Sequence, residues 1–377
     1  MKGDTVAIWD PTEPTTIIQI VGRTGGNEAI FTGRGIEMRA AELNLSRDDN
    51  TFWSPGPGQL IAHIAQIDSS KPSNDDKLIV EWNKTMRCNG LILQFEGLPD
   101  VNSSRVNVEY RTQRLAQKLW CDEMQISLNR QVMFFDDTSD IAPEPVDIRC
   151  VGNVHITNLQ RDRYGNPQSS AVARMARLRY IVERQYFFAD GPGELSLVFL
   201  GSSQGFGPNN VAGMPNKARN EERLNQLAVG FPDMMQGTFS DEKKEIDISG
   251  RTVRVGYCPA DSWNDRISTA DLSSARQRGY TMECEHLKIV EVSNPVDLSQ
   301  SFFDLTASHS AIIEGSGLFG RAQTIRFSQV ENIVDLDGNV TLHMMQNGQT
   351  IQQSGDRYVY DIQTGSVRFQ SQGLLLQ

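Results

Sequence analysis

The stretch "FWSPGPGQL", Phe52 to Leu60, places an aromatic pair, a Gly-Pro-Gly turn and a leucine in one run. The same arrangement returns as "FFADGPGEL", Phe187 to Leu195. Glycine reaches positive φ and proline presets the path of its neighbour, so Gly-Pro-Gly favours a tight turn. Aromatic residues favour pleated strands. The motif therefore predicts a strand, a turn and a second strand, used at equivalent corners of a repeated architecture, with the aromatic side chains pointing inward.

The likeness between the two copies extends upstream of the aromatic pairs without gaps. A looser third copy begins at Gly320, where "GRAQTIRF" resembles "GRGIEMRA" from Gly33. Two unrelated turns that share Gly-Pro chemistry are the alternative interpretation. The aligned upstream identities are Arg39 with Arg174, Ala41 with Ala176 and Leu43 with Leu178.

Short segments along the chain alternate between apolar and polar residues. This period of two is typical of strands with one apolar face. Glycine- and asparagine-rich clusters at Tyr164, Asp337 and Gln363 predict turns between the strands. Many short strands at close spacing predict an all-β fold, an elongated repeat of antiparallel strands. The alternating segments are "GNVHIT" (152–157), "GNVTLHM" (338–344), "MQISL" (124–128) and "SVRFQ" (366–370).

Helical signals are confined to the middle of the chain. "NKARNEERLNQLA", Asn216 to Ala228, predicts one short helix, and "STADLSSARQRG", Ser268 to Gly279, predicts another with Ser268 or Thr269 as its cap. "GSSQGFGPNN", from Gly201, predicts a flexible connection. We therefore expect a first β segment over 1–200, an irregular region with loops, short helices and strand over 201–280, and a second β segment over 281–377.

The bulk composition excludes several classes of function. The chain has 377 residues and a formal net charge of −11, which makes it a poor partner for nucleic acid. It contains no apolar run long enough for a membrane-spanning helix and no apolar secretory segment at its start. The five cysteines are scattered singly, which predicts buried thiols, with one bridge between adjacent strands as an alternative.

No motif assembles a catalytic, metal or cofactor site. "GSGLFG", from Gly315, has the glycine pattern of a dinucleotide loop, but an alternating segment follows it where a helix is required. "CEH", from Cys284, has no second pair of metal ligands. "DLDGN", from Asp335, departs from a calcium loop and fits a hairpin, and the Asp136–Asp137 pair sits in a loop sequence. We expect a protein that is not an enzyme and has no cofactor.

The two segments "GNVTLHMMQNGQTIQQSG" and "GDRYVYDIQTGSVRFQSQG" carry a resemblance to a known family. They resemble the organic-solvent-tolerance A family, the periplasmic β-jellyroll of lipopolysaccharide transport. The recurring motif of that family is Gly-Asn-Val with alternating apolar residues, followed by a Tyr-Asp-x-x-Thr-Gly hairpin and another alternating strand. The first half of this motif is matched again around Gly152. The matching residues are Gly338, Asn339, Val340, Leu342, Tyr360, Asp361, Thr364, Gly365, Val367 and Phe369.

The resemblance implies an open, V-shaped β-jellyroll in the periplasm or cell envelope, whose apolar interior holds acyl chains of lipopolysaccharide or a related glycolipid. Burial of acyl chains supplies about 0.8 kcal/mol per methylene. It also implies end-to-end strand addition to other envelope transport proteins, and a chain that is a piece of a longer protein. The groove residues would be Val154, Ile156, Phe187, Val340, Leu342, Val367 and Phe369.

Two other functions fit the same alternation. A structural or adhesive β-solenoid of the envelope would have a closed, dry core with no ligand. A carbohydrate-active enzyme on a β-helix would bring carboxylates together in an exterior cleft. Each groove candidate could also serve plain core packing.

Overall fold

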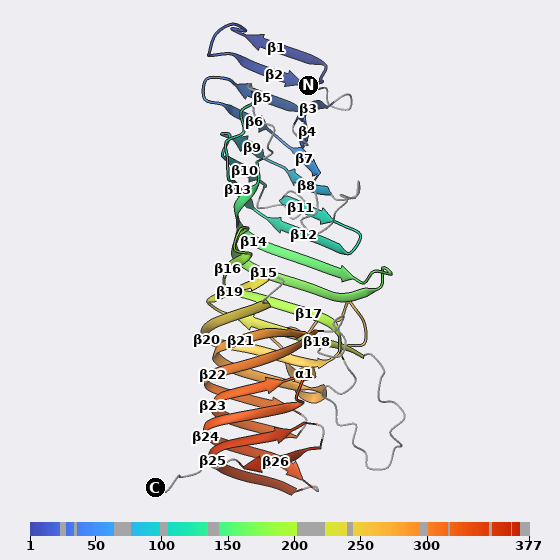
Figure 1. Ribbon diagram of the computed structural model, residues 1–377, viewed down its shortest axis with the longest axis vertical. Coiled ribbons are helices and arrows are strands. Elements are labelled where there is room, and N and C mark those ends of the chain that lie inside the picture. The colour runs from blue at the N-terminus through green and yellow to red at the C-terminus, as the bar shows by residue number, and fades with distance from the viewer. Residues whose placement is uncertain are drawn as a thin grey trace. The chain divides into compact units, whose positions relative to one another are not determined.

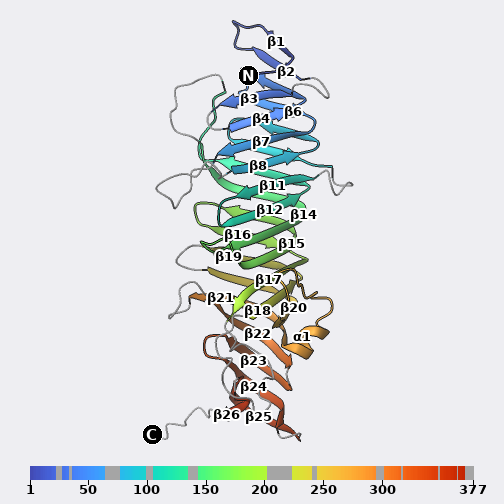
Figure 2. The same cartoon turned by 90° about the vertical axis from the view of Figure 1, so that its right-hand side faces the viewer.

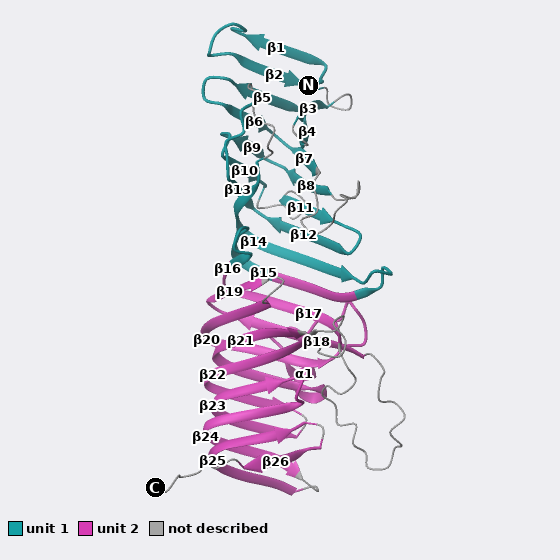
Figure 3. Ribbon diagram, in the orientation of Figure 1, with its two compact units in different colours: residues 1–167, 174–187 teal, residues 168–173, 188–377 magenta. Residues whose placement is uncertain are grey.

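The computed structural model describes residues 1–22, 28–33, 36–63, 77–98, 105–134, 143–201, 223–239, 244–293, 301–315, 317–346, 349–362 and 364–369. Among the described residues, 73% lie in strands and 2% in helix, which confirms the all-β class (Figures 1 and 2). The described strands include a closed barrel of six strands. The chain divides into two compact units (Figure 3). Unit 1 comprises residues 1–167 and 174–187, and unit 2 comprises residues 168–173 and 188–377.

Unit 1 consists of two antiparallel ladders, and consecutive strand pairs of the chain alternate between them. The first ladder runs, in pairing order, through β1 (Thr5–Trp9), β2 (Ile17–Val21), β5 (Glu42–Ser46), β6 (Thr51–Pro55), β9 (Thr85–Cys88), β10 (Ile92–Glu96), β13 (Glu123–Leu128) and β14 (Pro145–Arg161). The second runs through β3 (Ala29–Gly33), β4 (Ile36–Ala40), β7 (Gly58–His63), β8 (Lys77–Trp82), β11 (Val106–Arg111), β12 (Leu115–Cys121) and again β14.

The inner faces of the two ladders pack against each other. Phe31 of the second ladder lies 5.5 Å from Phe52 of the first, measured between ring centroids. Trp82 and Phe95 make the same kind of contact at 5.6 Å. Because alternate residues of a strand point to opposite faces, one apolar stripe per strand builds this core. Phe52, Trp82 and Phe95 are fully buried.

The first Gly-Pro-Gly motif is a corner between the ladders. Phe52 belongs to β6 of the first ladder, whereas Leu60 belongs to β7 of the second. The corner holds its position because the Trp82 indole N–H donates a hydrogen bond to the Gly56 carbonyl at 2.7 Å. In the second copy, Gly191 and Pro192 likewise lie between two strands, β16 (Tyr186–Asp190) and β17 (Gly193–Gly201). Phe187 is buried, as Phe52 is.

Gly58 shows why the corner needs glycine. A Cβ atom at this position would lie 2.3 Å from the Trp82 ring and 2.8 Å from the Arg39 carbonyl oxygen. Gly58→Ala should therefore destabilise the chain by about 1–3 kcal/mol through overpacking. Urea unfolding measures this effect, with Gly33→Ala as the control because its nearest neighbour would lie at 3.6 Å. Equal midpoints for the two variants would contradict the close approach.

Unit 2 also consists of two walls. Here most strands are long, and each of these long strands continues from one wall through the corner into the other. The chain order is β18 (Arg223–Phe231), β19 (Met234–Phe239), β20 (Lys244–Pro259), β21 (Tyr280–Ser293), β22 (Ser301–Gly315), β23 (Leu318–Ser328), β24 (Ile333–Gln346), β25 (Gln349–Asp361) and β26 (Ser366–Phe369). From β20 to β26 each strand pairs antiparallel with the next, and β17 pairs with β18. β15 (Pro167–Ile181) and β16 have residues in both units.

Each long strand bends where its pairing register shifts. β18 pairs with residues 254–259 of β20, and β19 pairs with residues 244–249. We call the wall on the β18 side the first arm and the wall on the β19 side the second arm. β14 of unit 1 is divided in the same way, because β12 pairs with its later half and β13 with its earlier half.

The "DGN" segment at Asp337 is a bulge inside β24, so the turn predicted there is wrong. The register shifts between Asp337 and Val340, and Gly338 and Asn339 have φ values of 79° and 52°. Gly152 and Asn153 adopt the same conformation in β14. Both glycine and asparagine tolerate the left-handed region, which serves a bulge as well as a turn.

The first predicted helix is also wrong over its described part. Residues 223–228 belong to β18, where buried Asn225 to Ala228 lie between β17 and β20, and residues 216–222 and 202–210 lie outside the described residues. The second is confirmed in a shorter form as α1 (Ser273–Arg278), preceded by Leu272 and not capped by Ser268 or Thr269. Ala275 packs α1 onto Ala228 and Cys258.

Candidate functional site

The predicted groove residues are distributed over the two units. Val154 is buried in unit 1, and Val340 and Leu342 are buried in the first arm of unit 2. Ile156 and Val367 are half-buried. Phe369, in the terminal strand β26, is 57% exposed and lies beside the Tyr358 ring at 5.4 Å. Burial of Val154, Val340 and Leu342 fits an apolar interior as well as plain core packing.

The two arms of unit 2 face each other across an apolar interior. Val255, Met282 and Ile313 of the first arm line the same internal cavity as Leu305 and Phe327 of the second. The cavity measures only about 10 Å³, so side chains fill nearly all of the space between the arms at this place. A space of this size has no room for an acyl chain.

Aromatic side chains meet where the free ends of the two arms approach each other. The Tyr257 ring of the first arm lies 5.8 Å from Phe327 of the second. The hydroxyls of Tyr280, from the first arm, and Tyr360, from the second, lie close enough to interact with each other. Burial raises the pKa of Tyr360, and the interaction with Tyr280 opposes that rise. We call Tyr257, Tyr280, Phe327 and Tyr360 the aromatic seam.

The seam is continued by β17. Phe199 of β17 lies edge-on to Phe303 of the second arm, with 4.9 Å between ring centroids. It also contacts Tyr257 at 6.5 Å. These contacts join the arms through side chains, and each aromatic pair of this kind contributes about 0.5–1.5 kcal/mol beyond its burial. The sequence signal was the alternation in "VRVGYC" and "GYTMEC", which places Tyr257 and Tyr280 on inward-facing positions.

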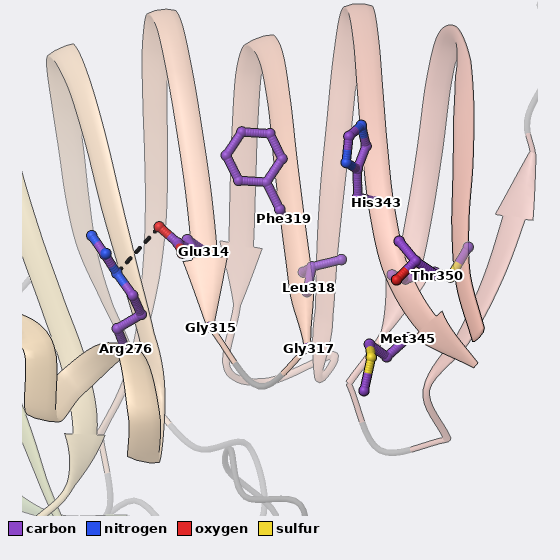
Figure 4. A pocket seen from close by; sticks show the side chains of 10 residues that line it. Arg276, Glu314, Gly315, Gly317, Leu318, Phe319, His343, Met345 and Thr350 are labelled. Carbon is purple, nitrogen blue, oxygen red and sulfur yellow. Dashed lines mark ion pairs between the residues drawn. The ribbon is translucent and has the colours of Figure 1, made fainter. Parts of the chain in front are cut away.

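A shallow pocket of about 240 Å³ lies at the free end of the first arm, beside α1 (Figure 4). Buried Leu318 and Met344 belong to its lining, and they are register partners on β23 and β24. Phe319 and His343 are register partners on the same two strands, and their tilted rings lie 5.6 Å apart. Arg276 of α1 is paired with Glu314 at 3.2 Å, so its charge is already balanced. The pocket combines interior apolar residues with a polar, charged margin.

The outer faces of the strands carry paired charges. Asp304 accepts from Arg326 at 2.9 Å and Asp335 from Arg357 at 2.6 Å. Such partly exposed pairs contribute about 0–1 kcal/mol each. Asp335 of the "DLDGN" segment is thus occupied by a cation partner. Asp136 and Asp137 lie outside the described residues.

Within the described part of the chain, no group of three histidine, cysteine or acidic residues could hold a metal ion. Cys284 of the "CEH" segment is buried, and burial raises its pKa to about 12, which disfavours the thiolate that a metal or a nucleophilic role requires. His286 lies on the opposite face, 3.7 Å from Asp247. Residues 318–328, after "GSGLFG", form β23 and provide no helix N-terminus for a pyrophosphate.

Comparison with known proteins gave no match to any family model, curated protein or solved structure. Among the described residues, no helix has both the length and the apolar character needed to cross a membrane. The function must therefore be inferred from the architecture and its interior.

Proposed function

We propose that this chain is a non-enzymatic carrier or bridge module of lipopolysaccharide transport in the periplasm or cell envelope, holding acyl chains of a glycolipid between its two walls. The observation that carries the proposal is the arrangement of the walls. Within each unit, two antiparallel walls meet along bent corners and turn apolar faces toward each other. We interpret this arrangement as the unloaded state of a V-shaped β-jellyroll, in which the two walls are closed onto each other.

Lipid loading requires the arms of unit 2 to part, because the interior cavity of about 10 Å³ has no room for an acyl chain. Parting of the arms at the aromatic seam would separate side-chain contacts such as that between Tyr257 and Phe327. Each long strand is paired through its backbone with the neighbouring strands. Across the seam, in contrast, the two arms contact each other through side chains. Acyl chains would replace side-chain contacts with contacts of the same apolar kind.

End-to-end association by strand addition is supported by β1. This strand ends the first ladder of unit 1 and pairs with β2. Val6 and Ile8 are 50% and 52% exposed, although they lie opposite Ile20 and Ile18, and Ile20 is fully buried. Within the described part of the chain, the interior apolar face thus continues onto β1 and is exposed there. A further strand from an envelope transport protein would cover this face and would pair with the free backbone groups of the edge strand β1.

Tight packing favours a second candidate, a structural or adhesive β-solenoid of the cell envelope. Its core would stay closed and would bind no ligand. The nearly filled interior of unit 2 is the observation on its side.

Native mass spectrometry separates the two candidates. The chain is expressed in a Gram-negative periplasm and purified without detergent. A carrier should retain glycolipid, visible as adducts with the mass of lipopolysaccharide or its precursors. The control is the same chain refolded from urea without lipid and then mixed with rough-type lipopolysaccharide. A folded chain that is free of lipid in both experiments would favour the scaffold.

A further inference from the structure

Two of the five buried cysteines lie together at the last corner between the ladders of unit 1. Cys121 is the final residue of β12, and Cys150 lies in β14 just before its bend. Both side chains have no exposed surface, and the two thiols lie close enough to interact with each other. The other three thiols have different surroundings. The Cys88 sulfur, for example, accepts the Gly90 N–H at 3.4 Å.

The backbone holds the two cysteines in place. Asp122 alone connects β12 to β13, and its N–H lies 3.1 Å from the Val151 carbonyl oxygen and 3.0 Å from that of Gly152. Its carboxylate pairs with Arg105 at 3.2 Å and accepts the Asn153 side-chain amide at 2.9 Å. The corner is thus fixed against β14 on both sides of the cysteine pair.

We propose that Cys121 and Cys150 form a disulfide when the chain meets an oxidising compartment. The bridge would tie the β12–β13 corner to β14, and so fix the junction at which the two ladders of unit 1 meet. It is independent of the proposed lipid function. Two thiols in contact, on strands that the backbone already holds together, favour a bridge that needs little rearrangement.

The chemistry is thiol–disulfide exchange with a small disulfide such as oxidised glutathione. One cysteine thiolate attacks the glutathione disulfide, forms a mixed disulfide and releases one glutathione thiolate. The second cysteine thiolate attacks the mixed disulfide and releases the other. The two cysteine sulfurs lose two electrons and two protons, and glutathione is reduced. The reaction should be slow, because the contact with Cys150 and burial raise the pKa of the Cys121 thiol, and local opening must admit the oxidant.

The test uses the full chain and oxidised glutathione as the probe. After oxidation the chain is unfolded in the presence of N-ethylmaleimide, and its intact mass gives the number of free thiols. We expect the alkylated thiols to fall from five to three, and a non-reduced digest to contain one linked peptide pair, Cys121 with Cys150. Reduction should lower the urea midpoint, since the bridge closes a loop across residues 121–150.

Two variants identify the bridge. Cys121→Ser should keep all four remaining thiols after oxidation, whereas Cys88→Ser should still lose two. The wild-type linked peptide decides the question even if a variant fails to fold. Five alkylated thiols after prolonged oxidation, or a linked pair that joins other cysteines, would overturn the proposal.

Discussion

Leu342→Ala should destabilise unit 2 by about 2–5 kcal/mol, the usual cost of truncating a fully buried leucine. Leu342 has no exposed surface and lies between Gly320 of β23 and Gln353 of β25 in the first arm. The loss combines the transfer free energy of the deleted methyl groups with the cavity that remains. Because β23 and β24 are paired on both sides at this position, the wall has little freedom to collapse onto that cavity.

Urea unfolding gives the overall loss, and hydrogen exchange followed by mass spectrometry locates it. Amides of β23 and β24 should exchange faster in Leu342→Ala, and those of β1 and β2 should not change. Phe369→Ala is the matched control, because Phe369 is 57% exposed and surface substitutions usually change stability by about 0.5 kcal/mol or less. Equal losses for the two variants would show that the first arm is not packed as described.

The strands were the most predictable part of the fold. Apolar alternation in "GNVTLHM" places Val340, Leu342 and Met344 on one face, and all three are buried in β24. The signal is local, because a strand with one buried face must repeat every two residues. Phe369 follows the same pattern but is exposed, because β26 is the terminal strand of the described ladder. Alternation identifies a face and does not say whether a second wall covers it.

Pairing order was not predictable, because it depends on contacts between distant segments. Gly-Pro-Gly indicated a corner, yet nothing near Phe52 shows that β6 pairs with β9 while β7 pairs with β4 and β8. The Gly338–Asn339 pair was assigned to a turn for a similar reason. A hairpin turn and a bulge use the same left-handed backbone, and only the partner strands distinguish them.

Over its described residues, 223–228, the predicted helix is wrong because tertiary contacts decide the conformation of this segment. "RLNQLA" has the straight-chain and small residues that favour helix. In the structure, Asn225 and Gln226 are buried between β17 and β20, and the Gln226 side-chain amide lies 3.3 Å from the Pro259 carbonyl. The aromatic seam was missed because its four members come from four strands and meet only in space.

A covalent link that holds the aromatic seam closed should strongly reduce glycolipid uptake. In Tyr280→Cys/Tyr360→Cys, a short bismaleimide joins the first arm to the second across the position where the two tyrosine hydroxyls interact. A covalent link is needed because the native contacts at the seam contribute only a few kcal/mol and yield to a bound lipid. We expect the cross-linked chain to take up at least about tenfold less rough-type lipopolysaccharide than the same variant alkylated with a monofunctional maleimide, a ratio equal to about 1.4 kcal/mol.

The matched control is Tyr257→Cys/Tyr280→Cys, cross-linked with the same reagent. Tyr257 and Tyr280 are register partners on neighbouring strands of the first arm, so this link leaves the two arms free to part. It should load lipid as well as the alkylated variant does. Undiminished uptake by the Tyr280–Tyr360 cross-link would place the entrance elsewhere while leaving the carrier function intact. Absence of uptake by wild type and by every variant would instead refute the carrier, and the packed interior would then be the core of a scaffold.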